Sequence, residues 1–262
     1  MKHAEAPSTR PSRKQDRGYW DNMAASWDDE IFNSLHHDKF GIIAEELRRS
    51  ARAARSVADF GCGTGNYLPF LSRLFEHVHG FERSRPCVAM AQALVGGLGH
   101  VAVHPASAGA LRRFGRFDVV LCANVAVHPS LRARQGILRS VRSLLAPGGR
   151  LILIVPALES ARMVAAAERS APGGQAGGAG DWDADSHAGG VVTIEGMPYK
   201  HYGKEELRWF LKQLGFAVLR IRRVKYSWGS QGVRATPDIR DTLPWDWIAV
   251  GRRTSGVSPA GA

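Results

Sequence analysis

The chain has 262 residues, of which 44% are hydrophobic, enough for the core of one domain with a lid or a small insertion. It contains no uninterrupted apolar run of about 18 residues, so we expect no membrane span. Its N-terminus lacks the apolar segment of a secretion signal. These features predict a cytoplasmic protein.

The net charge of +11 is divided between the tails and the body of the chain. Residues 1–18 hold five basic and two acidic side chains, which gives +3, and residues 251–262 add two arginines, which leaves +6 for the body. Arginines spread over helix faces favour a solvated basic surface. An acidic substrate or a nucleic-acid contact stays open.

Both ends of the chain have the composition of disordered tails. Residues 1–17 are polar and basic with two prolines, and residues 254–262 follow the last expected strand. Between them we expect one domain, residues 18–253. It begins with a helical lid at 18–55, where apolar side chains recur at helical spacing from Phe40 to Leu47.

From Ser56 onward, short apolar runs alternate with amphipathic runs, which predicts a doubly wound α/β domain with a parallel sheet covered on both faces. Strands are expected at 57–60, 77–81, 100–103, 117–123 and 150–155, and helices at 66–75, 85–95 and 130–145. Pro147-Gly148-Gly149 predicts a sharp turn before the fifth strand.

An insertion is expected at 157–202, with a flexible loop at 171–190 that holds seven glycines. The loop contains Asp181, Asp183 and Asp185, but the glycine and glutamate of a calcium loop are missing, so we expect no metal site. After the insertion we expect a helix that ends at Gly215, a strand to about Tyr226 and a last strand over 245–250.

Three cysteines occur, Cys62, Cys87 and Cys122. Their odd number and their spacing fit neither a disulfide framework nor a metal site. Buried free thiols in a reducing compartment are the favoured interpretation.

The most informative run is Val57-Ala58-Asp59-Phe60-Gly61-Cys62-Gly63-Thr64-Gly65-Asn66, an apolar strand followed by a glycine loop and then a helix. Glycine permits tight turns and leaves space for a ligand. The G-x-G-x-G spacing differs from the G-x-G-x-x-G of dinucleotide-binding folds and from the phosphate-binding loop of nucleotide hydrolases, so a pyrophosphate ligand is disfavoured. A glycine turn without any ligand remains the alternative.

A second strand ends at Glu82, 17 residues after Gly65, near the offset that one intervening helix requires. A carboxylate only accepts hydrogen bonds, and two ribose hydroxyls can both donate to it. A solvated carboxylate at the start of a helix is the alternative for Glu82.

The glycine run resembles motif I of the class I S-adenosylmethionine-dependent methyltransferases. The resemblance covers about residues 19–253, because Phe117–Asn124 looks like the fourth strand of that family and Leu144–Leu151 like the fifth. It implies a Rossmann-like sheet of order 3-2-1-4-5-7-6 with strand 7 antiparallel. It also implies that the loop wraps the amino-acid end of S-adenosylmethionine and that Glu82 holds the ribose.

One departure from the family concerns adenine. Members usually carry an Asp after the third strand, where this chain has Ala106 and Ser107. Adenine is then expected to bind main-chain groups, Ser107 and apolar surfaces. The residues expected to bind the cofactor are Tyr19, Trp27, Asp59, Gly61, Cys62, Gly63, Gly65, Asn66, Glu82, Ala106, Ser107 and Asn124.

Methyl transfer from a sulfonium is an in-line displacement that depends chiefly on alignment, and a general base helps when the acceptor is a hydroxyl or an ammonium. His128, just past the fourth strand, is the first candidate base, and His201 is the second. Tyr19, Trp20 and Trp27 are expected to lie over the sulfonium by cation–π attraction. Exposed loop histidines and core aromatics are the alternatives.

The leading hypothesis is a methyltransferase that acts on an O or N atom of a small molecule. A nucleic-acid methyltransferase is the second hypothesis, although Asn124-Val125-Ala126-Val127 lacks the prolines of amino-adenine enzymes. A cofactor-binding protein without catalysis is the third, and a nicotinamide oxidoreductase is disfavoured by the glycine spacing. No pattern in the sequence identifies the acceptor or the oligomeric state.

Overall fold

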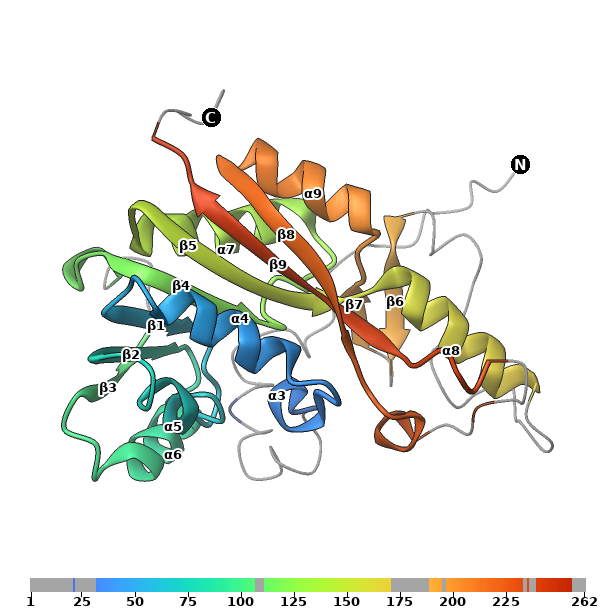
Figure 1. Cartoon of the computed structure of the whole chain (residues 1–262), viewed down its shortest axis with the longest axis horizontal. Coiled ribbons are helices and arrows are strands. Elements are labelled where there is room, and N and C mark those ends of the chain that lie inside the picture. Colours follow the sequence, from blue (N-terminus) through green and yellow to red (C-terminus); the bar gives the residue numbers. More distant parts are fainter. Residues whose placement is uncertain are drawn as a thin grey trace, which may run out of the picture.

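The computed structural model describes residues 21, 32–106, 111–170, 189–194, 197–232, 235 and 239–255. In these residues the chain forms a seven-stranded sheet of order β3-β2-β1-β4-β5-β9-β8 and a separate two-stranded hairpin, β6-β7 (Figure 1). Strands β1 to β5 pair in parallel, and β9 is antiparallel to both β5 and β8. The predicted fold class and strand order are confirmed, since the hairpin only shifts the numbers of the last two strands by two.

The strands of the large sheet are β1 (Ser56–Phe60), β2 (His77–Glu82), β3 (Val101–Pro105), β4 (Phe117–Ala123), β5 (Leu145–Pro156), β8 (Phe216–Lys225) and β9 (Trp245–Arg253). The hairpin consists of β6 (Val191–Ile194) and β7 (Met197–Lys200). The helices are α3 (Ser34–His37), α4 (Ile42–Ala51), α5 (Leu68–Leu71), α6 (Arg85–Val95), α7 (Leu131–Leu144), α8 (Leu158–Ser170) and α9 (Lys204–Gln213), with 3₁₀ turns η3 (Leu111–Arg113) and η5 (Trp228–Gln231).

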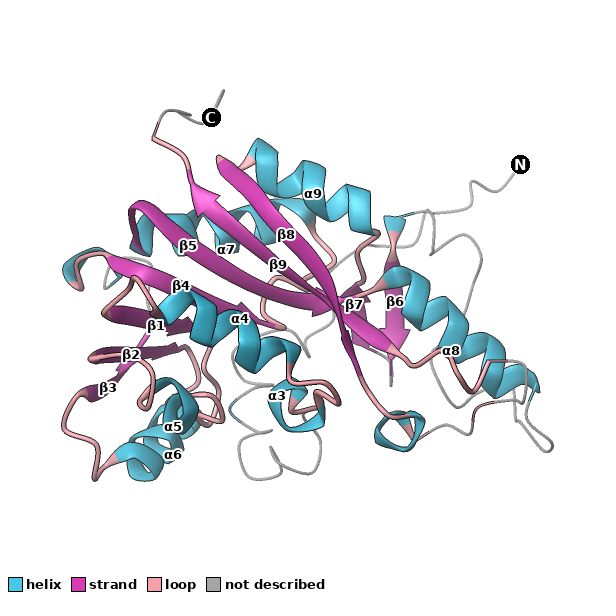
Figure 2. Cartoon of the chain, viewed as in Figure 1, coloured by secondary structure: helices cyan, strands magenta, loops and turns pink. Residues whose placement is uncertain are grey.

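Helices cover both faces of the sheet (Figure 2). Alternate residues of a strand point to opposite faces, and β5 shows this directly. Leu151 and Leu153 pack with α7 and α9 in one buried cluster. Ile152 and Ile154 pack with α4, α5 and α6 in the other. The near-continuous apolar run of this strand is therefore the signature of a strand buried on both sides.

Two local predictions were wrong. The helix expected over 66–75 is reduced to α5, because Gly65 turns with φ of +97° and the main chain after Leu71 makes tight three-residue turns such as Leu74 N to Leu71 O. The fifth strand begins at Leu145, five residues earlier than expected. It includes Gly148 at φ +75°, and the pairing with β4 shifts register there.

The insertion contains structure that the sequence pattern did not predict, namely α8 and the β6-β7 hairpin. Residues 171–188 of the expected flexible loop, and residues 1–17 of the expected tail, lie outside the described residues. The last two residues of the loop accept hydrogen bonds from the end of the hairpin and the residue after it. Lys200 Nζ donates to Gly189 O at 2.7 Å, and His201 N donates to Gly190 O at 2.7 Å.

The three cysteines are free and buried, as predicted. No helix in the described part of the chain is both long and apolar enough to cross a membrane.

Helix α4 is joined to the edge strand β8 by a buried carboxylate. Glu46 is fully buried, and its two oxygens accept from Arg220 and Arg222 at 2.9 Å each. Glu45, which is 44% exposed, also accepts from Arg222 at 2.9 Å. The paired arginines keep about a third of their surface exposed, so the ion pair is only partly removed from water.

Glu46→Ala should therefore lower the free energy of unfolding by about 2 kcal/mol, because it leaves two guanidiniums without their buried partner. Urea denaturation measures the change. Glu45→Ala is the matched control and should cost less than about 1 kcal/mol, because Glu45 is itself 44% exposed and water screens its ion pairs. Equal losses for the two variants would contradict the assignment of Glu46 as the buried link.

Candidate functional site

The glycine loop is attached to the end of β2 by main-chain hydrogen bonds. Gly61 N and Cys62 N both donate to Phe81 O, at 2.7 and 3.2 Å. Gly63 N donates to Glu82 Oε2 at 3.1 Å. Because parallel strands end at the same edge of a sheet, these contacts bring the predicted loop and the predicted acid together at the carboxyl edge of the sheet.

Glu82 is also fixed on its other side. Its Oε1 accepts from Arg83 N at 2.6 Å and from Ser84 N at 2.8 Å. An ionised carboxylate offers about four acceptor positions. Three main-chain donors therefore orient the Glu82 carboxylate and leave acceptor capacity for a ligand hydroxyl.

The glycine positions of the loop meet two separate structural requirements, positive φ angles and close packing. Gly61, Gly63 and Gly65 all have positive φ, at +79°, +54° and +97°. A Cβ on Gly61 would lie 2.3 Å from a methyl of Val125, and a Cβ on Gly65 would lie 3.1 Å from the Cβ of Ala91 in α6. The loop thus packs closely against both neighbouring elements, which only glycine permits.

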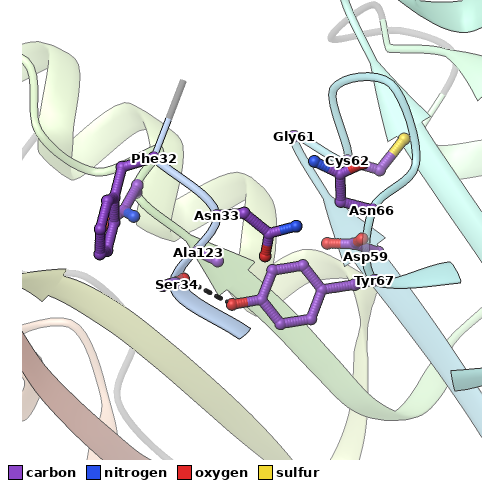
Figure 3. A pocket seen from close by; sticks show the side chains of 10 residues that line it. Phe32, Asn33, Ser34, Asp59, Gly61, Cys62, Asn66, Tyr67 and Ala123 are labelled. Carbon is purple, nitrogen blue, oxygen red and sulfur yellow. Dashed lines mark hydrogen bonds between the residues drawn. The ribbon is translucent and has the colours of Figure 1, made fainter. Parts of the chain in front are cut away.

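A pocket opens between this loop, the end of β4 and helix α3. It is lined by Phe32, Asn33, Ser34, Asp59, Gly61, Cys62, Asn66, Tyr67, Ala123 and Asn124. In Figure 3 the side chains of Asn33, Asp59 and Tyr67 point toward one another across it. The buried Ser34 hydroxyl and the Tyr67 phenol are 2.7 Å apart, so a hydrogen bond ties α3 over the pocket.

Two hydrogen-bond acceptors in the pocket are buried without partners. Asp59 is 1% exposed, and its Oδ2 has no hydrogen-bond partner. Asn124, the one non-glycine residue with positive φ among the described residues, at +56°, has a buried Oδ1 that is also unpartnered. Burial, together with the nearby charge of Glu82, raises the pKa of Asp59 to about 7. Such groups are costly unless a ligand donor meets them, and an ammonium group supplies such donors.

The structure brings most of the predicted cofactor residues together. Asp59, Gly61, Cys62, Asn66 and Asn124 line the pocket. Gly63 joins them through its bond to Glu82, and Ala106 N donates to Glu82 O at 2.6 Å. Tyr19, Trp20, Trp27 and Ser107 lie outside the described residues.

The two candidate bases do not line this pocket. His128 lies in the turn before α7, where its Nδ1 accepts from Ser130 N at 2.9 Å. The proton of the neutral ring is then on Nε2. Burial, and next the charge of Arg134, lower the pKa of His128. His201 is 5% exposed, and its Nδ1 is 3.1 Å from Tyr199 O, so Nδ1 carries the proton there.

Several residues near the pocket were not predicted. Phe32, Asn33 and Ser34 come from a helix of four residues and the segment before it, too short to give a periodic signal. Tyr67 could have been suspected, because it directly follows Asn66. Beside Phe32, the Tyr226 hydroxyl donates to Asp246 at 2.9 Å, and burial raises the pKa of Asp246 to about 6.

The sheet order is that of the class I methyltransferases, and the glycine loop and Glu82 lie where the resemblance implies. A methyltransferase-domain family model matches residues 35–221. The chain therefore belongs to this methyltransferase family, and as a class I member it uses S-adenosylmethionine as methyl donor. None of the curated proteins matches it.

Solved structures share the fold at low identity. The 1,6-didemethyltoxoflavin-N1-methyltransferase of Burkholderia thailandensis has a TM-score of 0.62 and 16% identity, with 96% of this chain and 94% of that chain covered. The CcbJ methyltransferase of Streptomyces caelestis has a TM-score of 0.60 and 19% identity, with 92% and 100% covered. A Haloferax volcanii complex of the Trm112 methyltransferase activator with a putative methyltransferase gives 0.61 and 14%, with 94% and 100% covered.

The raised pKa of Asp59 makes stability depend on pH. Because the folded pKa is about 7 against an ordinary value of 3.8, the folded state binds more protons than the unfolded state between those values. Without ligand, wild-type stability should then fall as pH rises through that window. Asp59→Asn removes this pH dependence. Between pH about 4 and about 8, the free energy of unfolding of the variant should therefore rise by up to about 4 kcal/mol relative to that of the wild type.

Urea titrations of both proteins at the two pH values measure this difference. Asp118→Asn is the control, and its stability difference from the wild type should change little between the two pH values, because the effect of a pKa below 3.8 falls at lower pH. Burial acts to raise the pKa of Asp118, but hydrogen bonds from Arg55 and Ser56 outweigh it, so the pKa is lowered. A stability difference between Asp59→Asn and wild type that does not change with pH would refute the assignment.

Proposed function

We propose that this methyltransferase transfers its methyl group to an O or N atom of a small-molecule acceptor. The observation that carries the proposal is the partial cover of the pocket, since α3 lines one side of it and the Ser34–Tyr67 hydrogen bond holds the helix there. An acceptor that has to reach the methyl group past this helix is best a small molecule. The toxoflavin-type N1-methyltransferase of similar fold supports the same class of acceptor.

In this proposal Asp59 and Asn124 accept hydrogen bonds from the ammonium of the cofactor's amino-acid end, and Glu82 accepts from the ribose hydroxyls. Ala106 and Ser107 bound the adenine, while Tyr19 and Trp27 cover the sulfonium. S-Adenosylmethionine supplies an electrophilic methyl group on a positively charged sulfur. We place this chemistry in the domain 18–253 and in the cytoplasm, where the three buried thiols stay reduced.

His128 and His201 act on the acceptor in this proposal, in different protonation states. With Ser130 N bonded to its Nδ1, His128 presents an N–H at Nε2 and serves as a donor that orients the acceptor. With Nδ1 donating to Tyr199 O, His201 has its lone pair at Nε2, the form that a proton acceptor requires.

Methylation of RNA is the second candidate function, favoured by the net charge of +11. A cofactor-binding role without catalysis is a third. One experiment separates the three: the purified protein with S-adenosylmethionine is offered a panel of small amines, phenols and carboxylic acids, and separately total RNA, and release of S-adenosylhomocysteine is measured. Turnover with a small molecule supports the proposal. Turnover with RNA alone, or with neither class, refutes it.

Gly63→Val should weaken S-adenosylhomocysteine binding at least about a hundredfold. A β-branched residue is strained at φ +54°. Relief of this strain would move the main chain and disturb the hydrogen bond from the N–H of this residue to Glu82. Calorimetry measures the affinity, and circular dichroism checks the fold. Gly148→Val is the matched control, with φ of +75° and open space around it at the opposite edge of the sheet. Retained binding in the Gly63 variant would show that the loop is not the cofactor loop.

His128→Gln should lower turnover at least about tenfold, while its affinity for S-adenosylhomocysteine stays within about twofold of wild type, because His128 does not line the cofactor pocket. Initial rates with the acceptor found by the panel, together with calorimetry, give both values. His100→Gln, an exposed histidine bonded to Ser72 O, serves as control. Unchanged turnover would remove His128 from the acceptor site.

A further inference from the structure

Six cations lie on α7 and on segments that contact it. They are Arg113, Arg116, Arg139, Arg142, Lys212 and Arg253, which we call the basic face. Helix α7 carries four arginines and no acid. The turn η3, which ends at Arg113, contacts α7. Lys212 lies in the last turn of α9, and Gly215, two residues after the end of this helix, lies beside Arg142.

Three guanidiniums of the basic face converge. Arg116 Nη1 donates to Leu145 O at 3.3 Å, Arg253 Nη1 donates to the same oxygen, and Arg142 Nη2 donates to Thr254 O at 3.2 Å. Burial, and then the charges of Arg116 and Arg142, lower the pKa of Arg253. In addition, Arg142 Nε is buried and has no hydrogen-bond partner among the described residues. The cluster therefore holds three like charges close together.

Five arginines elsewhere in the described residues have carboxylate partners. Arg49 pairs with Glu45, Arg55 with Glu76, Arg208 with Glu205, and Arg220 and Arg222 with Glu46. No member of the basic face makes an ion pair with any described residue. The basic face thus differs from these five paired arginines, and it groups six cations that have no neutralising acid among the described residues.

An exposed aromatic ring lies near one of these cations, Lys212. Trp209 is 59% exposed on α9, three residues before Lys212 and so on the same side of the helix. Arginine binds phosphate oxygens in a bidentate manner, and an exposed indole can stack on a base. We propose that the basic face binds single-stranded nucleic acid, with the arginines on the phosphates and Trp209 against a base.

The basic face and the methyl-transfer pocket lie at opposite edges of the sheet. Arg116 precedes β4, and Arg253 ends the antiparallel β9, so both mark the amino edge of the parallel strands, where α7 and β9 end in Figure 1. The pocket is at the carboxyl edge. A nucleic-acid strand bound on the basic face would therefore hold the enzyme without occupying the pocket, whatever the methyl acceptor is.

The test uses the full chain and a fluorescein-labelled uridine oligonucleotide of about 20 nucleotides. Fluorescence anisotropy is recorded between about 25 and about 300 mM KCl. We expect the logarithm of the binding constant to fall linearly with the logarithm of the KCl concentration. Arg113→Gln/Arg139→Gln removes two exposed cations whose side chains make no hydrogen bond to any described residue. The double variant should reduce the salt slope by about 0.7 for each phosphate that it no longer neutralises.

The matched control is Arg162→Gln/Arg169→Gln, which removes the same charge from exposed positions on α8 and should change little. Trp209→Ala should weaken binding at least about fivefold. No binding at the lowest salt, equal losses in the control, an unchanged Trp209→Ala affinity, or tighter binding of polyglutamate would each overturn the proposal. The last outcome would favour an acidic protein partner. Calorimetry with S-adenosylhomocysteine shows whether any variant also loses the cofactor.

Discussion

The attachment of the glycine loop to the end of β2 is the constraint on which the site depends. Phe81 O receives two main-chain donors from the loop, and Glu82 receives a third. These bonds fix the loop directly after β1, the strand that holds Asp59. The glycine loop and the buried Asp59 side chain therefore line the same pocket.

That buried acid explains why the pocket is suited to a cation. Asp59 and Asn124 both present oxygens with no hydrogen-bond partner among the described residues, and burial keeps Asp59 close to half protonated near neutral pH, since its pKa is about 7. A ligand with an ammonium group would satisfy both oxygens and favour the ionised carboxylate. Binding energy is thus stored in the free protein as an unsatisfied site, in the way that preorganised sites store it.

The sequence predicted the elements that have strong local signals. Strands buried on both sides, the glycine loop and the acid after β2 all follow from patterns within about ten residues, and their order along the chain implies the sheet. Helix α5 was overestimated because Gly65 and the tight turns after Leu71 override an apolar pattern.

The rest of the pocket could not be predicted, because it depends on tertiary contact alone. Ser34 matters only because Tyr67, 33 positions later, meets it. Asp246 is distinguished from other acids only by its burial and by Tyr226. The protonated nitrogens of His128 and His201 likewise follow from bonds to Ser130 N and Tyr199 O, which no spacing rule reveals.

The topology of the fold also separates charge. Helices that follow parallel strands run back against them, so their C-termini gather at the amino edge, where helix dipoles favour cations. This effect accounts for Arg142 and Lys212, which lie in the last turns of α7 and α9. It does not account for Arg116 and Arg253, which belong to strand ends. Arg116 and Arg253 therefore add positive charge to that of the helix ends, whereas Asp59 and Glu82 lie at the carboxyl edge. The proposed nucleic-acid strand, which is anionic, and the cationic cofactor are thereby directed to opposite edges of the same sheet.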